Sequence, residues 1–202
     1  MNLYILVEGE TETIVYPKWI SILLPFMVQV TNFDEIINDC FYLFNSGGYP
    51  SILDDIVTAV DDINQVKAYD YLVICLDSDD LSSQEKYDEV MDYIHSASLV
   101  CSAEIVVIIQ TACMETWFLG NRRICSKSPQ GTEFRRYRDF YDVFENDPEA
   151  MLKIDDFEGT KAEFHYTYLK KMLEERRTFY RKTRPNVVCE DYYLKEVTIQ
   201  HS

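Results

Sequence analysis

Short apolar runs alternate with amphipathic segments along the first 110 residues. Five runs rich in strand-forming side chains predict buried strands: Leu3–Val7, Val28–Thr31, Cys40–Phe44, Tyr71–Leu76 and Ala103–Ile109. Three longer segments with apolar residues at helical spacing predict helices: about Thr11–Met27, Ser51–Val66 and Gln84–Ser98. This alternation predicts an α/β fold with a mainly parallel sheet flanked by helices and connected by right-handed crossovers.

The pattern changes after Gly120. Asn121–Arg138 is polar and basic and contains Pro129 and Gly131, so it predicts a flexible or substrate-ordered loop. Glu158–Lys182 predicts a long helix, followed by a short one over about Val188–Val197. The long helix is expected to have one apolar side: Phe164, Tyr168, Met172 and Phe179. We therefore expect an α/β domain over residues 1–120, with residues 121–202 as a basic loop and helical extension packed on it.

Acidic side chains follow two of the predicted strands. Glu8 comes directly after the first strand, and Gly9 is expected to supply backbone freedom for a sharp exit into the next helix. Asp77 and Asp79 follow Tyr71–Leu76. Parallel strands gather their carboxyl ends at one edge of a sheet, where such folds bind ligands. Taken alone, Glu8 has an ordinary alternative role as a charge at the start of a helix.

Gathered carboxylates need a counter-charge. Two of them 4 Å apart repel by roughly 4 kcal/mol at an effective dielectric of ~20, and hard divalent cations prefer oxygen ligands. The sequence therefore indicates a metal site that contains Glu8, Asp77 and Asp79. Glu12, one helical turn after Glu8, is expected to complete this site or to hold a second ion.

Two further polar residues lie in apolar surroundings. Glu115 follows the last predicted strand and has Met114 and Trp117 nearby, so it is either an exposed helix charge or a metal ligand. If it is buried, a cation or hydrogen bonds must keep it ionised. His165 lies in the middle of the predicted long helix, and a hydrogen-bonded, partly buried histidine is expected there in preference to a catalytic one.

The segment Val7-Glu8-Gly9-Glu10-Thr11-Glu12, with a strand ending Asp77-x-Asp79 about 70 residues later, resembles a TOPRIM domain over about residues 1–120. It is most similar to TOPRIM nucleases of the overcoming-lysogenization-defect type and to small TOPRIM effectors of phage-defence systems. The resemblance implies a Rossmann-like TOPRIM sheet with a C-terminal helical extension. It also implies an Mg²⁺- or Mn²⁺-dependent nuclease acting on DNA or RNA.

The resemblance also implies residue roles and a partner. Glu8, Asp77 and Asp79 would be catalytic as metal ligands, joined at the metals by Glu12 and Glu115. Lys182, in Tyr180-Arg-Lys-Thr-Arg-Pro185, would stabilise charge on the scissile phosphate; a solvated helix end is the ordinary alternative. An ATPase partner protein is expected, because TOPRIM nucleases in such systems are often paired with one and this chain has no Gly-x-x-x-x-Gly-Lys motif.

Charge distribution supports a second interpretation. The net charge is −16, but residues 1–121 hold 3 Lys/Arg against 20 Asp/Glu, whereas residues 122–202 hold 16 against 15. Basic side chains in the second part suit a phosphate backbone. The acidic first part suits a non-catalytic TOPRIM-like binding subunit or a DNA mimic within a larger complex. Primase and strand-passing topoisomerase chemistry are not expected, because a zinc-binding region and an adequate tyrosine domain are absent.

Composition restricts the location and the cofactor. With 47% apolar residues the chain suits a globular protein. It contains no run of ~20 apolar residues, so we expect no membrane association. No basic region precedes the first strand, so we expect no signal peptide and a cytoplasmic location. The six cysteines form no Cys-x-x-Cys pair, which disfavours zinc, and Cys75 and Cys101 are expected to be core thiols. Homo-oligomerisation remains open.

Overall fold

A computed structural model describes residues 1–200 of the chain. Its contacts divide into two compact units, which we describe separately. The sheet unit comprises residues 1–76 and 83–109, and the helical unit comprises residues 77–82 and the chain from 110 onward. The division was expected after residue 120, whereas in the structure it falls at the end of β5, and residues 77–82 also belong to the helical unit.

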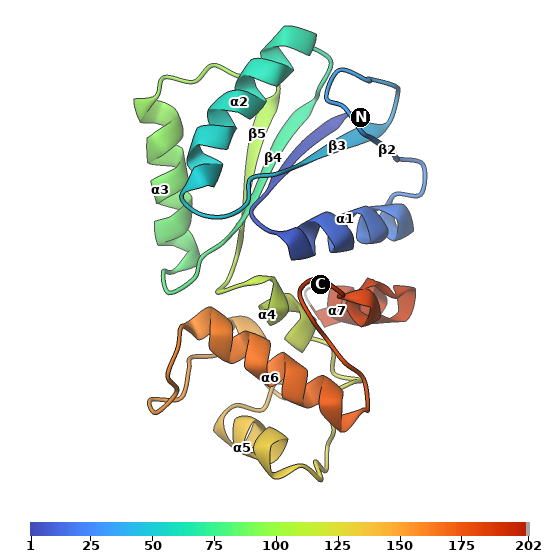
Figure 1. The fold of residues 1–202 in the computed structure, drawn as a ribbon, viewed down its shortest axis with the longest axis vertical. Helices are drawn as coiled ribbons and strands as arrows, with labels where there is room; N and C mark the ends of the chain where they lie inside the picture. The colour runs from blue at the N-terminus through green and yellow to red at the C-terminus, as the bar shows by residue number, and fades with distance from the viewer. Residues whose placement is uncertain (201–202) are drawn as a thin grey trace. The chain divides into compact units, whose positions relative to one another are not determined.

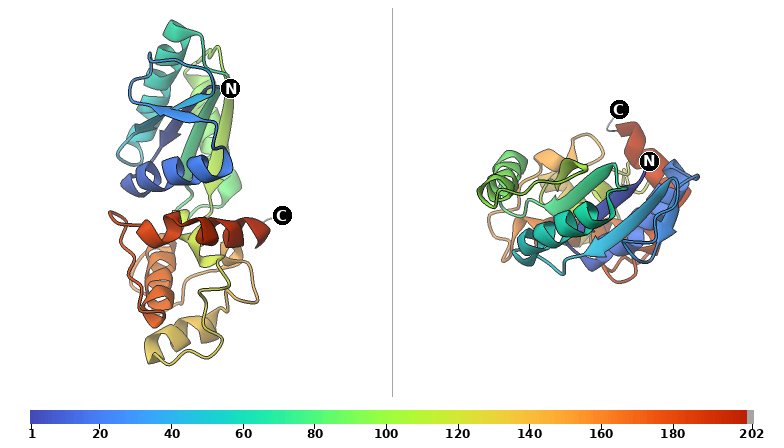
Figure 2. Two further views of the ribbon diagram at one scale, coloured as in Figure 1. Left: turned by 90° about the vertical axis from the view of Figure 1, so that its right-hand side faces the viewer. Right: turned by 90° about the horizontal axis from the view of Figure 1, so that it is seen from above.

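The sheet unit contains a five-stranded sheet in the order β2-β3-β1-β4-β5 (Figure 1). The strands are β1 (Leu3–Val7), β2 (Val28–Val30), β3 (Cys40–Asn45), β4 (Tyr71–Asp77) and β5 (Glu104–Gln110). β1 pairs in parallel with both β3 and β4, and β2 pairs in parallel with β3. Figure 2 shows these strands side by side with the twist usual in such sheets. The expected mainly parallel α/β architecture is confirmed.

Three helices connect the strands: α1 (Glu10–Leu23), α2 (Ser51–Val66) and α3 (Ser83–Ser96). Figure 1 shows α2 and α3 next to each other against the sheet. Their buried residues form one core with alternate residues of the central strands, among them Tyr4, Leu6, Leu72 and Ile74. The intervening residues, such as Val7 and Cys75, are also buried but lie outside this core, so they face the opposite side. Both faces of the central strands are therefore covered.

The helical unit contains short helices around one long one. These are α4 (Met114–Leu119), α5 (Thr132–Phe140), η1 (Pro148–Ala150), α6 (Lys161–Glu175), η2 (Asn186–Cys189) and α7 (Asp191–Gln200). Both α4 and α5 pack on α6 (Figure 1). Phe164, Tyr168 and Met172 of α6 are fully buried, as the apolar spacing predicts. None of the helices in residues 1–200 is long and apolar enough to cross a membrane.

Two expectations for this unit are wrong. The segment predicted to be a flexible loop contains helix α5, because Phe134 and Tyr137 pack their rings against Tyr168 of α6. The long helix stops at Glu175 and does not reach Lys182. Phe179, expected on its buried side, is 79% exposed. Both errors arise because tertiary contacts decide where these marginal helices begin and end.

Candidate functional site

The turn after β1 brings the Glu12 side chain back against Gly9. A Cβ atom at Gly9 would lie 3.0 Å from Glu12 Oε2, closer than such contacts normally come. Gly9 itself has φ −133° and ψ 176°, an extended conformation open to any residue. The expectation that Gly9 supplies backbone freedom is therefore wrong. Glycine instead leaves room for the carboxylate of Glu12, which is only 4% exposed.

Strand register relates the two acidic motifs. Val7 of β1 pairs with Cys75 of β4 in parallel. Glu8 follows the first of these residues directly, and Asp77 is two residues beyond the second. Each motif therefore begins at or directly after the end of one of two adjacent, parallel strands.

Glu8 and Glu12 each shift the pKa of a nearby residue in the sheet unit, Tyr49 and Cys75 respectively. The pKa of the Cys75 thiol is raised to about 12, mainly by burial and in part by the Glu12 carboxylate, while a hydrogen bond from Tyr16 opposes the rise. The Tyr49 hydroxyl donates to Glu89, which raises the tyrosine pKa to about 12, with a contribution from Glu8. Glu12 therefore lies near the carboxyl-terminal half of β4, and Glu8 lies near the loop before α2.

The segment after β4 is held by main-chain bonds to the segment after β5. The Ser78 N–H donates to the Gln110 carbonyl over 2.9 Å, and the Asp79 N–H donates to the Ala112 carbonyl over 3.1 Å. The Ala112 N–H donates in turn to Ser78 Oγ over 2.8 Å. Asp79 has φ 51°, a left-handed conformation that aspartate tolerates better than most residues. Main-chain hydrogen bonds therefore hold Ser78 and Asp79 in place within the helical unit.

Asp80 has a structural role, which was not predicted from the amino-acid sequence. Its Oδ1 accepts a hydrogen bond of 3.0 Å from the N–H of Lys161, the first residue of α6. Helix N-termini expose unsatisfied N–H groups and favour negative charge. Asp80 therefore anchors the start of α6. The amino-acid sequence shows it only as a third aspartate after Asp77 and Asp79, which does not indicate a helix cap.

Glu115 and Lys182 meet in the helical unit. Glu115 is 1% exposed, so the interpretation as an exposed helix charge is wrong. Its Oε1 accepts a 2.8 Å hydrogen bond from the Tyr180 hydroxyl, and its Oε2 lies 3.8 Å from Lys182 Nζ. Lys182 reaches it from the turn 181–184 and not from a helix end. Tyr180 was not predicted, since an aromatic residue there is typical of a helix core.

Asp77 belongs to the same surroundings. Burial raises the pKa of the Cys113 thiol well above its usual range, and the nearby carboxylates of Glu115 and Asp77 raise it further. The Lys182 ammonium lowers the pKa of the same thiol. The charges of three predicted site residues therefore all affect the pKa of Cys113: Asp77, Glu115 and Lys182.

His165 has a structural environment, as expected. It is fully buried; its Nδ1 lies 2.7 Å from Thr116 Oγ1 and its Nε2 lies 3.1 Å from the Met151 carbonyl. A carbonyl only accepts, so Nε2 carries the proton and Nδ1 accepts from Thr116. Burial lowers the histidine pKa to about 4, which keeps the ring neutral at pH 7.

Carboxylate donors suit Mg²⁺ or Mn²⁺, but residues 1–200 hold no group of three or more His, Cys, Asp or Glu side chains arranged around a metal position. Mg²⁺ commonly binds through one or two carboxylates together with water and substrate phosphates.

Comparisons of the chain with protein-family models, with curated proteins and with solved structures find no match.

Proposed function

We propose that this chain is a divalent-metal-dependent nuclease that hydrolyses phosphodiester bonds in DNA or RNA. The observation that carries the proposal is the parallel pairing of β1 with β4, in which Val7 pairs with Cys75. It supports a shared ligand edge because Glu8 and Asp77 follow these residues on adjacent strands. A nuclease that recruits its cation together with the substrate phosphate needs few preformed protein ligands.

In this proposal Glu8, Asp77 and Asp79 supply the principal carboxylates, and Glu12 and Glu115 supply further contacts to the ion or its water. Bound Mg²⁺ or Mn²⁺ would activate water and neutralise charge on the phosphate. Lys182, which is half exposed, would orient the phosphate and stabilise the negative charge that develops on it. The Glu115 carboxylate would hold the Lys182 ammonium in place.

The resemblance to TOPRIM effectors extends the proposal to a biological setting. There the nuclease would act in phage defence, alongside an ATPase that supplies the nucleotide hydrolysis for which this chain has no motif. Such a partner would control when cleavage occurs, so the isolated chain need not be active. Cleavage and metal binding are therefore measured first on the isolated chain and then with the partner added.

The test measures cleavage of single-stranded DNA, duplex DNA, single-stranded RNA and tRNA with Mg²⁺, with Mn²⁺ and with EDTA. We expect metal-dependent cleavage that Asp77→Asn and Glu8→Gln each abolish. Asp92→Asn, an exposed acid on α3, is the matched control and should cleave normally. Cleavage that persists in EDTA, or in Asp77→Asn, would contradict the proposal.

Metal binding has a separate readout. A cation that binds only the folded protein at 100 times its Kd raises the free energy of unfolding by about 2.7 kcal/mol. We expect Mn²⁺ to raise the Tm of the wild type and of Asp92→Asn but not of Asp77→Asn. Equal shifts in all three proteins would mean that the ion binds elsewhere.

A non-catalytic role is favoured by one observation, the 20 acidic against 3 basic residues in positions 1–121. A DNA mimic would bind a basic protein without metal, and Asp77→Asn would weaken that binding no more than Asp92→Asn. Under this alternative no substrate is cleaved with any partner present.

A further inference from the structure

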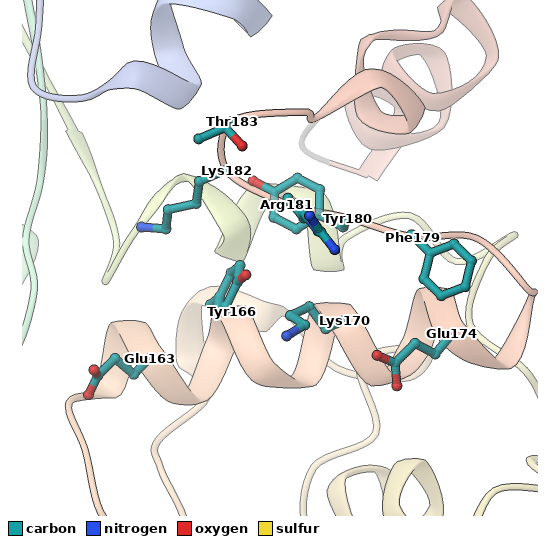
Figure 3. Close-up of a pocket in the computed structure, with 9 residues that line it drawn as sticks. All are labelled: Glu163, Tyr166, Lys170, Glu174, Phe179, Tyr180, Arg181, Lys182 and Thr183. Atoms are coloured by element: carbon teal, nitrogen blue, oxygen red, sulfur yellow. The ribbon is translucent and has the colours of Figure 1, made fainter.

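An open pocket of about 670 Å³ lies entirely within the helical unit. One wall is the outer side of α6, including Tyr166 and Lys170, and the other is the segment from Phe179 to Thr183 (Figure 3). Its volume is in the range of pockets that hold small organic ligands. The proposed hydrolysis assigns a role to Lys182 alone among the residues that line it.

The pocket exists because the chain reverses at the end of α6. The Thr178 N–H donates to the Leu173 carbonyl and the Arg177 N–H donates to the Glu174 carbonyl, over 3.0 and 2.8 Å. These are the two bonds of a Schellman motif, with Arg177 at φ 57°. The following residues therefore run back along α6 instead of extending it.

A tight turn then sets the direction of the basic side chains. The Arg184 N–H donates to the Arg181 carbonyl over 2.9 Å, and the two residues form an antiparallel bridge. This places Lys182 and Thr183 at the tip of the turn. Arg181, Lys182 and Thr183 are all exposed, and Figure 3 shows them across the pocket from Tyr166 and Lys170.

The pocket combines cations with aromatic rings. Lys170 Nζ lies 5.3 Å from the centre of the Tyr166 ring, and the exposed guanidinium of Arg181 lies across from it. Phe179 presents a ring that is 79% exposed at one end of the pocket. A large apolar ring that is exposed next to cations suits a ligand with a flat face and negative charge.

Two glutamates also line the pocket, but both carboxylates already have partners. Glu163 Oε2 accepts from the Thr160 N–H over 2.8 Å in the capping box of α6. Glu174 Oε2 lies 3.2 Å from Lys171 Nζ. Lys182 is likewise shared with Glu115, so Lys170 and Arg181 are the cations that remain for a ligand.

We propose that this pocket binds single-stranded nucleic acid, with a base stacked on Phe179 and the adjoining phosphates on Arg181 and Lys170. Stacking platforms flanked by cations are the usual means of holding single strands, whose bases are open on both faces. A duplex offers phosphates but no free base face. The inference rests on the proposed function only in taking nucleic acid as the partner, and it makes that substrate single-stranded.

Fluorescence anisotropy in EDTA tests the pocket without cleavage. The probes are a labelled 20-nucleotide single strand, the duplex of the same sequence and a mononucleotide. We expect the single strand to bind more tightly than the other two. Phe179→Ala should weaken single-strand binding about 5- to 150-fold, the loss expected for one stacked base. Arg181→Ala should weaken single-strand binding less than Phe179→Ala does. It should also make the slope of log K against log [salt] shallower by about 0.7, the value for one lost phosphate contact.

Two exposed residues of the helical unit outside this pocket, Tyr192 and Arg122, supply matched controls. Tyr192→Ala and Arg122→Ala should bind as the wild type does. Wild-type affinity in both Phe179→Ala and Arg181→Ala would overturn the inference, as would equal affinity for the mononucleotide or tighter binding of the duplex.

The pocket and the hydrolytic function fail in different ways. Asp77→Asn should keep its affinity for the single strand while it loses cleavage. Single-strand binding that depends on Phe179, with no cleavage by any protein, would remove the nuclease proposal and leave the pocket assignment standing. Metal-dependent cleavage with an unchanged KM in Phe179→Ala would remove the pocket assignment and leave the nuclease proposal standing.

Discussion

Lys182 Nζ lies 3.8 Å from Glu115 Oε2, although the lysine side chain is 54% exposed and the glutamate only 1%. The pair links a buried carboxylate to the surface of the helical unit. The Tyr180 hydroxyl binds the other carboxylate oxygen over 2.8 Å. One acidic side chain therefore positions both a tyrosine and a lysine of the same segment.

Tyr180→Phe should lower the free energy of unfolding by about 1–3 kcal/mol, because it leaves Glu115 Oε1 without its buried donor. Urea denaturation measures this loss. Tyr166→Phe, on the neighbouring wall of the pocket, is the matched control and should change stability by less than about 0.5 kcal/mol. Equal losses in the two variants would mean that the buried hydrogen bond contributes no special stability.

Lys182→Met should reduce metal-dependent cleavage about 10²- to 10³-fold if the lysine stabilises charge on the phosphate. Its exposure limits the cost to folding, which thermal unfolding checks. Lys182→Arg keeps the charge and should retain more activity than the methionine variant. Full activity in Lys182→Met would restrict the residue to a structural role beside Glu115.

Gly9→Ala should destabilise the protein by about 1–3 kcal/mol, because the new methyl group would press on the Glu12 carboxylate. A double-mutant cycle identifies the cause. In a Glu12→Ala background the same Gly9→Ala change should cost much less, since the clashing atom is gone. An unchanged cost there would show that Gly9 is needed for a different reason.

Stability should fall between pH 6.5 and pH 4 because of His165. Its pKa is about 4 in the folded protein against 6.5 as the ordinary value, so the unfolded chain binds the extra proton in this range. Between pH 7 and pH 5 the contribution is on the order of 2 kcal/mol. Denaturation of His165→Gln at both pH values should show a pH dependence smaller by that amount. His95→Gln, an exposed histidine on α3, should match the wild type.

Arg177→Gly should raise the free energy of unfolding by about 0.5–1 kcal/mol, because glycine adopts the left-handed conformation at the end of α6 without strain. Lys67 ends α2 with the same φ of 57°, and Lys67→Gly should behave alike. Chemical denaturation measures both. A loss of stability in Arg177→Gly alone would indicate that the arginine side chain has contacts that outweigh the backbone gain.

Local patterns were sufficient for the sheet unit. The apolar runs that became β1 and β4, and the spacing of Ile52, Ile56 and Ile63 that became α2, give each element one stable way to bury its side chains. The chain order of strands and helices then leaves few topologies. For this reason the parallel sheet and the position of Glu8 and Asp77 at strand ends could be predicted from the amino-acid sequence.

The helical unit depends on contacts between residues far apart in the chain. Helix α5 forms because Phe134 and Tyr137 find rings on α6, and α6 ends early because its C-terminal hydrogen bonds turn the chain back. The partners of Glu115 lie 65 or more residues further along the chain. Such contacts leave no periodic signal, since their free energy depends on side chains that only the folded chain brings together. The strands and their acidic ends thus follow from local patterns of residues, whereas the buried Glu115 carboxylate, its Lys182 partner and the pocket beside them form only in the folded chain.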